Sequence, residues 1–333
     1  MARPGAASTR PLVVIVPQPP SAAIAFVDGR HGWAGGSGGL LGTRDGRTFR
    51  VEAREAVVGI SALDRRHAWA ITGDGFVLRT IDGQRWARLG APHLFRVQFV
   101  TRQTGFGLTR EGAVVRSVDA GRAWPQLKAP GSMQAECFAD ARDGWVARAG
   151  SVWTTHDAGA SWTRTNLQRA RQGFPVPELG CRGRDVWVVF HEGAAAGTEG
   201  YRVYRSLDSG SSWRAVFASP FQNRLPSISN YAGPFSVLGG GGAAIFSGFC
   251  SPCDGFGTAS FVRTLDGGTT LRRSTPLHGY TPEALSFVDA DRGWLVTGAH
   301  AGSATAVRLG VVWRTLDGGR TWRTVLRAPE LAP

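Results

Sequence analysis

The sequence predicts an all-β fold, a seven-bladed β-propeller whose blades are four-stranded antiparallel sheets. Three observations predict it. A short turn motif recurs seven times, a second motif precedes nearly every copy, and the repeat length leaves room for about four short strands per copy. The 46 glycines are scattered along all 333 residues, which indicates many tight turns rather than one flexible linker.

The turn motif in its full form reads Thr/Ser-x-Asp-x-Gly-x-Thr/Ser-Trp, as in Ser117–Trp124 and Thr155–Trp162. The Asp side chain suits a hairpin turn because it accepts hydrogen bonds from turn amides. The Gly suits a backbone position with positive φ, and the final aromatic residue fills the space between sheets. We therefore expect a structural role for the seven motif aspartates, Asp45, Asp82, Asp119, Asp157, Asp208, Asp266 and Asp317.

The second motif is an apolar pair, a polar turn and then Gly-Trp, as in Phe138 to Trp145 and Phe287 to Trp294. Each repeat thus contains four short strands, A to D, in which the second motif joins A to B and the first joins C to D. We expect an N-terminal extension over residues 1–20 and a single propeller domain over 21–333. The predicted blades are about 21–55, 56–92, 93–130, 131–168, 169–219, 220–276 and 277–328.

Together the two motifs resemble those of the Asp-box (bacterial neuraminidase repeat) propellers, and within them the photosystem II assembly-factor-like group. The resemblance covers residues 23–326. It implies binding or assembly scaffolds, because propellers of that group act in this way. Relatives with the same turn include sialidases, xyloglucan-cleaving glycosidases and sortilin-type receptors. The resemblance is specific for the fold and much less so for function, because one scaffold hosts many activities.

The repeat spacing is uneven. Successive motif aspartates are 37, 37, 38, 51, 58 and 51 residues apart, so blades 5 to 7 contain insertions. The second motif places these insertions between strands B and C, and in blade 6 also between blades. In an up-and-down blade these connections lie on one face, whereas the A–B turns and the Asp turns lie on the other. Long loops on one face of a regular scaffold usually carry the function.

We therefore expect a non-catalytic scaffold that binds a protein or glycan partner through the long loops of blades 5 to 7. We expect it to act as a monomer without a cofactor or metal. The candidate binding residues are aromatic or polar groups in the non-repeating segments of that face, namely Glu192, Phe221, Arg224, Tyr231, His278 and Tyr280.

The alternative is a sialidase-like or other glycoside hydrolase that uses the same face. Arg224-Leu-Pro resembles the Arg-Ile-Pro element of sialidases, which use a Tyr nucleophile. Tyr201 with Glu199, or Tyr280 with Glu283, could supply that pair. However, the sialidase element precedes the first turn motif, whereas Arg224 follows the fifth, and no set of three substrate-binding arginines can be assigned. We therefore assign no catalytic residue.

The net charge of +13 raises the possibility of nucleic-acid binding. Almost all of the positive charge is arginine, with Lys128 as the single lysine, and the arginines follow the repeat instead of clustering. A dispersed charge of this kind is a weak signal, so nucleic acid is not the expected partner.

The four cysteines fit two disulfides, Cys250–Cys253 within one loop and Cys137–Cys181 between successive repeats, with free thiols as the alternative. Paired cysteines favour an extracytoplasmic location. The apolar run Leu12–Val16 is too short for a signal peptide or an anchor, and no other run could span a membrane. A cytoplasmic location therefore stays open.

Overall fold

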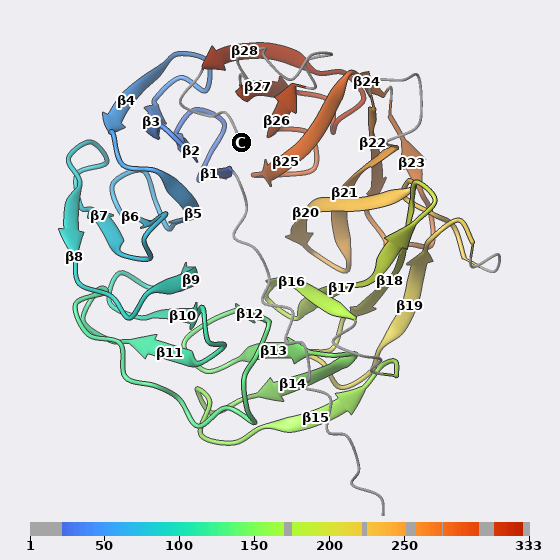
Figure 1. Cartoon of the computed structure of the whole chain (residues 1–333), viewed down its shortest axis with the longest axis horizontal. Coiled ribbons are helices and arrows are strands. Elements are labelled where there is room, and N and C mark those ends of the chain that lie inside the picture. The colour runs from blue at the N-terminus through green and yellow to red at the C-terminus, as the bar shows by residue number, and fades with distance from the viewer. Residues whose placement is uncertain are drawn as a thin grey trace, which may run out of the picture.

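The computed structural model describes residues 22–169, 175–221, 225–250, 257–274, 276–299 and 310–328. In these ranges the chain forms seven antiparallel sheets around a central axis, each from consecutive strands (Figure 1). The prediction of an all-β seven-bladed propeller is confirmed. None of the described residues forms a helix with the length and apolar character that crossing a bilayer requires.

Each blade begins with an inner strand beside the axis and continues outward. The inner strands are β1 (Ala23–Phe26), β5 (Val57–Ala62), β9 (Leu94–Phe99), β12 (Ala135–Phe138), β16 (Val176–Arg182), β20 (Tyr231–Gly239) and β25 (Tyr280–Phe287). The second strands are β2 (Gly32–Gly36), β6 (Ala68–Thr72), β10 (Gly105–Thr109), β13 (Gly144–Arg148), β17 (Asp185–Ala195), β21 (Ala243–Cys250) and β26 (Gly293–Ala299). The third strands are β3 (Gly39–Thr43), β7 (Val77–Thr80), β11 (Val114–Ser117), β14 (Ser151–Thr155), β18 (Thr198–Ser206), β22 (Thr258–Thr264) and β27 (Gly310–Thr315). The outer strands are β4 (Phe49–Ala53), β8 (Ala87–Leu89), β15 (Thr163–Asn166), β19 (Arg214–Ala218), β23 (Arg272–Arg273), β24 (Leu277–His278) and β28 (Arg323–Ala328).

The antiparallel order gives the propeller two different faces. One face, called here the turn face, carries the first-to-second turns and the Asp turns between third and outer strands. The other, called the loop face, carries the second-to-third connections and the links between blades. In blade 5 the extra residues lengthen strands instead of forming an open loop. β17 and β18 run for 11 and 9 residues and meet at Ala196 and Gly197, both with positive φ.

Two blades depart from four strands, and proline contributes to both departures. Blade 3 has a three-stranded sheet, and an isolated bridge between Val115 and Gln126 stands where its outer strand would run. Pro125 precedes that bridge and has no N–H to donate to a ladder. In blade 6 the outer strand is split into β23 and β24, which both pair with β22, and Pro276 lies between them.

Polar contacts between inner strands fasten neighbouring blades around the axis. The hydroxyl of Ser286 accepts the backbone N–H of Phe26 across the blade 7–blade 1 interface (3.0 Å). The hydroxyls of Ser61 and Ser236 accept the backbone N–H groups of Phe99 and Phe287 in the same way. The side-chain carbonyl of Gln98 accepts the backbone N–H of Phe138. Between blades 4 and 5 the equivalent position is Cys137, which forms a disulfide with Cys181. A covalent bond therefore takes the place of the hydrogen bond at this interface.

Aromatic stacking fills the space between blades. The Phe26 ring on β1 lies 3.6 Å from that of Trp294 on β26, and Trp69 and Phe99 form the same stack between blades 2 and 3. The indole N–H of Trp294 donates to the carbonyl of Gly46, in the Asp turn of blade 1. Because the described strands of blades 1 and 7 belong to separate sheets, these side-chain contacts hold the ring closed.

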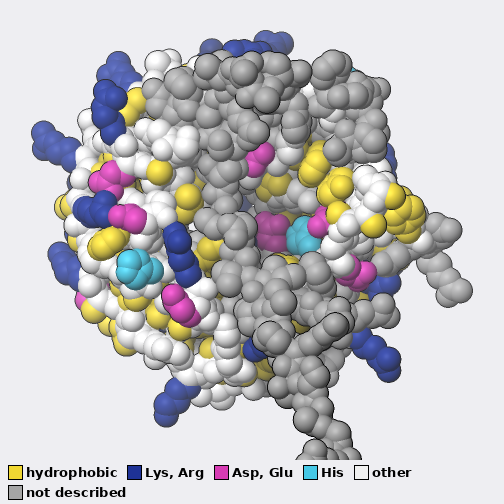
Figure 2. Space-filling model, viewed as in Figure 1, with side chains coloured by type: hydrophobic (Ala, Val, Ile, Leu, Met, Phe, Trp, Pro, Cys, Tyr) yellow, Lys and Arg dark blue, Asp and Glu magenta, His cyan; other side chains and the backbone are white. Residues whose placement is uncertain are grey.

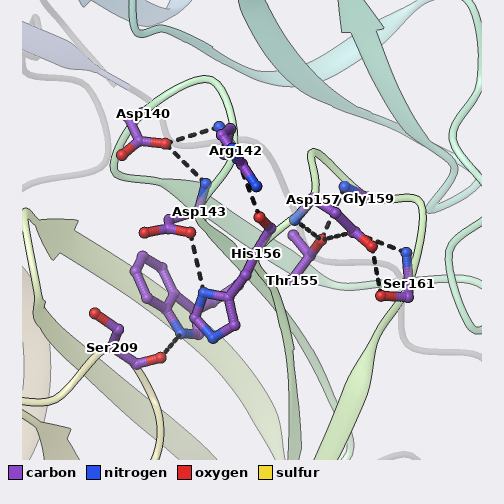
Figure 3. A network of polar contacts seen from close by, with 10 residues as sticks. Asp140, Arg142, Asp143, Thr155, His156, Asp157, Gly159, Ser161 and Ser209 are labelled. Carbon is purple, nitrogen blue, oxygen red and sulfur yellow. Dashed lines mark hydrogen bonds and ion pairs between the residues drawn. The ribbon is translucent and has the colours of Figure 1, made fainter.

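The seven motif aspartates all accept turn amides. In blade 4, Oδ1 of Asp157 accepts the N–H of Ser161 (2.8 Å), while the Thr155 hydroxyl donates to Asp157 and accepts the N–H of Gly159 (Figure 3). The Ser161 hydroxyl also donates to Oδ2 of Asp157 (2.6 Å), and this bond, together with the Ser161 N–H and the Thr155 hydroxyl, holds the pKa of Asp157 at about 2. The equivalent bonds recur at the other six, Asp45, Asp82, Asp119, Asp208, Asp266 and Asp317.

The replacement Asp119→Ala is expected to lower the free energy of unfolding by about 1–3 kcal/mol, because it leaves the N–H groups of Arg122 and Ala123 without their acceptor. The bonds to these amides, above all Ala123, lower the pKa of Asp119. Its contribution is therefore present at neutral pH and disappears as the pH falls below about 4. Urea unfolding at pH 7 and pH 3 measures both effects, and an equal loss at the two pH values would contradict this role.

Candidate functional site: the central channel

A cavity of about 320 Å³ lies on the propeller axis and is lined by all seven inner strands. The lining residues come from the first half or the middle of each strand, and each inner strand starts at the loop face. The cavity therefore occupies the part of the channel nearer that face. Viewed along the axis, acidic side chains and a histidine gather around the hollow at the centre (Figure 2).

The channel wall is apolar except at a few positions. Aliphatic and aromatic side chains such as Ile24, Leu179 and Phe235 make up much of it. The charged residues in the wall are Arg96 on β9, Glu136 on β12, Glu178 on β16 and Glu283 on β25. Carboxylates thus outnumber cations here, in a protein whose overall charge is +13.

Glu136 is the most enclosed of these groups, with 5% of its surface exposed. Burial raises the pKa of its carboxyl to about 7, and the nearby Arg96 guanidinium offsets part of that rise. Among the described residues, Oε2 of Glu136 has no hydrogen-bond partner, and neither does Nε of Arg96. The two groups therefore interact by charge across the blade 3–blade 4 interface without a direct hydrogen bond.

His191 on β17 stands between two carboxylates of the same blade. Its Nδ1 lies 2.9 Å from Oε1 of Glu199 on β18, and its Nε2 lies 3.9 Å from Oε2 of Glu178. Burial alone would lower the pKa of His191, but the two carboxylates outweigh it and raise the pKa well above its usual range. The imidazolium therefore stays charged at neutral pH and fixes Glu178 at the edge of the cavity.

The proposed Tyr201–Glu199 catalytic pair does not fit this arrangement. Tyr201 is fully buried, its hydroxyl donates to the carbonyl of Ser229, and it accepts the N–H groups of Ile228 and Ser229. Burial raises its pKa to about 12. A phenol held in this way supports the blade 5–blade 6 connection and is not available to attack a substrate. The described residues also include no group of three or more His, Cys, Asp or Glu side chains able to hold a metal.

The five predicted residues that the structure describes lie on the loop face, but they contact different neighbours. Gln168 donates to exposed Glu192, and Tyr231 stacks on Phe249. Tyr280 packs edge-on against Trp313 and accepts from Arg327, while His278 lies 3.3 Å from the Thr258 hydroxyl. Phe221 is 68% exposed. Arg224 lies outside the described residues, as does Cys253, the expected partner of the disulfide-bonded Cys250.

The sequence analysis did not identify the channel residues as a group, although one signal was present. Each inner strand ends at a position that pairs with the start of the second strand. Two residues before that position, most blades carry an apolar side chain, such as Ile24, Ile60 or Val97. Blade 4 carries Glu136 there. A charge at an apolar position of a buried strand is costly unless it has a role, so the repeat alignment alone could have identified it.

A second cavity, about 500 Å³, lies on the turn face between blades 7 and 1 and is lined by Arg47, Arg314 and Arg323 among others. Arg314 donates there to the carbonyl of Gly29, and Arg79 reaches Ala120 in the same way between blades 2 and 3. These arginines therefore serve the repeating contact between blades, and the channel is the better candidate site.

No protein-family model matches this chain, and no curated protein matches it. The solved structure titled "YCF48 bound to D1 peptide" has a TM-score of 0.58 and 16% identity, covering 86% of this chain and 93% of that one. The structure of YCF48 from Cyanidioschyzon merolae has a TM-score of 0.59 and 18% identity, and the match covers 91% of this chain and 97% of that one. The GH74 xyloglucanase from Xanthomonas campestris gives 0.66 and 14%, covering 96% of this chain but 56% of the enzyme. The predicted resemblance is confirmed as a likeness of fold.

Proposed function

We propose that this protein is a non-catalytic scaffold that binds a polypeptide partner on its loop face, at the mouth of the central channel. The observation that carries the proposal is the contrast between the faces. The turn face repeats one hydrogen-bonded turn in every blade, whereas the loop face combines the extended β17–β18 hairpin with a charged cavity.

Two further observations favour a polypeptide over a glycan or a hydrolase substrate. Charged walls suit a partner that brings charge of its own, which neutral sugars lack. In addition, a similar fold occurs in the structure titled "YCF48 bound to D1 peptide". The likeness to a GH74 enzyme, at 14% identity, is one of fold, and the Tyr201 hydroxyl that the sialidase-like alternative would use is buried and hydrogen-bonded to backbone.

We also propose an extracytoplasmic location, as a monomer. The Cys137–Cys181 disulfide and the disulfide-bonded Cys250 support it, because disulfides persist mainly in oxidising compartments. Trapping thiols in intact cells before lysis tests this location, and alkylation of Cys137 would contradict it.

The experiment is selection of peptides from a displayed random library on the immobilised intact chain, followed by calorimetric titration of the enriched peptides. Tyr231→Ala on the loop face is expected to weaken them by about 1–3 kcal/mol, as truncation of an aromatic anchor does. Arg30→Ala on the turn face is the matched control and is expected to change nothing.

Two outcomes would overturn the proposal. One is enrichment of peptides that Arg30→Ala weakens and Tyr231→Ala does not. The other is absence of any enriched peptide together with hydrolysis of xyloglucan or of a fluorogenic sialoside by the purified chain.

A further inference from the structure

The channel places three carboxylates at increasing depth. Phe138, Cys181 and Phe287 occupy equivalent positions near the ends of their inner strands, because each pairs with a residue at or next to the start of the second strand. Glu136 lies two residues before Phe138, Glu178 lies three before Cys181, and Glu283 lies four before Phe287. Since every inner strand runs from the loop face inward, Glu283 is nearest the mouth and Glu136 is deepest.

The deepest carboxylate, Glu136, has an oxygen atom that accepts no hydrogen bond from the described residues. Glu136 is 5% exposed and lines the cavity, and the atom without a donor is Oε2. A buried acceptor of this kind costs free energy in the unliganded protein. That cost is recovered if a partner supplies a donor, and a charged donor recovers most.

The walls between the carboxylates suit an aliphatic stem. Ile24, Ile60, Leu179 and Leu285 line the cavity beside the acids. Arginine and lysine side chains have this construction, with apolar methylenes that end in a cation. A guanidinium in addition offers five donors in a planar fork that matches a carboxylate.

We propose that the central channel receives an arginine or lysine side chain of the polypeptide partner, whose cationic end reaches Glu136 while Glu178 and Glu283 line its path. This inference rests on the proposed function and specifies the chemistry of its site. Arg96 and the charged His191, which lie in or beside the channel, offset part of the negative charge of these carboxylates.

The same geometry couples binding of the cation to loss of a proton from Glu136. The strands packed against β12 present Arg96 from β9 and Glu178 from β16, and its own-blade neighbour β13 places uncharged Val146 opposite Glu136. The Glu136 carboxyl, with its pKa at about 7, is partly protonated at neutral pH. A cation binds the ionised form, so binding releases a proton and strengthens as the pH rises from about 6 to 8.

The test uses the library-selected peptides on the full chain. Enriched peptides are expected to share a basic residue. Replacement of a shared arginine by citrulline, which keeps its shape and removes its charge, or acetylation of a shared lysine, is expected to weaken binding about tenfold or more. Glu136→Gln is expected to cause a similar loss for the basic peptide and none for the citrulline peptide. Glu111→Gln, an exposed carboxylate on the same face, is the matched control.

Calorimetry in buffers of different ionisation enthalpy measures how many protons are released when the peptide binds. This proton release is expected to be absent in Glu136→Gln. Glu178→Gln provides a second variant should Glu136→Gln fold poorly. Loop-face peptides that lack a basic residue, or that bind both variants as tightly as the wild type, would overturn this inference and leave the proposed function standing. Absence of any loop-face peptide would overturn both.

Discussion

Loss of the Cys137–Cys181 disulfide is expected to lower the free energy of unfolding by about 4 kcal/mol, the loop-closure entropy of two residues 44 positions apart. The bond joins the inner strands of blades 4 and 5, where other interfaces use a hydrogen bond between a Ser or Gln side chain and a backbone N–H. Urea unfolding of Cys137→Ser, followed by tryptophan fluorescence, measures the loss.

The repeat supplies a matched comparison for this prediction. The double variant Cys137→Ser with Cys181→Phe recreates the Ser–Phe pair seen at Ser286–Phe26. Its free energy of unfolding is expected to be about 1 kcal/mol higher than that of Cys137→Ser, which is the net contribution of one hydrogen bond. Reduction of the wild-type protein by dithiothreitol, which also opens the disulfide of Cys250, should lower the free energy of unfolding at least as much as Cys137→Ser does. A loss below about 1 kcal/mol in Cys137→Ser would mean that the disulfide adds little to the neighbouring contacts.

The replacement Trp294→Ala is expected to cost about 3–5 kcal/mol, because Trp294 is fully buried, stacks on Phe26 and donates to Gly46. Its effect should also be local. Every other pair of neighbouring blades is consecutive in the chain, whereas blades 1 and 7 meet through side chains and through hydrogen bonds between their separate sheets.

Hydrogen exchange distinguishes this local effect from general destabilisation. In Trp294→Ala, faster exchange is expected first in β1, β2, β26 and β27. Trp69→Ala is the matched control, because Trp69 makes the equivalent stack and hydrogen bond between blades 2 and 3. Identical exchange patterns in the two variants would show that ring closure does not depend on the Trp294 contact.

The repeat made the fold predictable from the sequence. Each Asp turn requires the same local hydrogen bonds, so residues such as Asp119 mark the third-to-outer turn without knowledge of the rest of the chain. Departures from the repeat were harder to predict. The outer strand of blade 3 is lost after Pro125, and the blade 5 insertion became a long hairpin because its residues continue the ladder of β17 and β18.

The candidate site was much less predictable, because it is built from residues far apart in the chain. Glu136 departs from the apolar pattern of its repeat, but only the ring, which brings β9 and β12 side by side, places it next to Arg96 of another blade. Tyr201, which the sialidase-like alternative would use as a nucleophile, also depends on the fold. Its hydroxyl donates to the carbonyl of Ser229 and accepts the N–H of Ile228, which its place in the sequence does not indicate.

The central claim is that a partner engages the loop face at the channel mouth, and hydrogen exchange of the intact chain with a selected peptide tests it most directly. Protection is expected in β12, β16 and the first residues of β20, with none in the Asp turns. Protection centred on the first-to-second turns around Asp28 and Asp140, with unchanged exchange in β12 and β16, would contradict the claim.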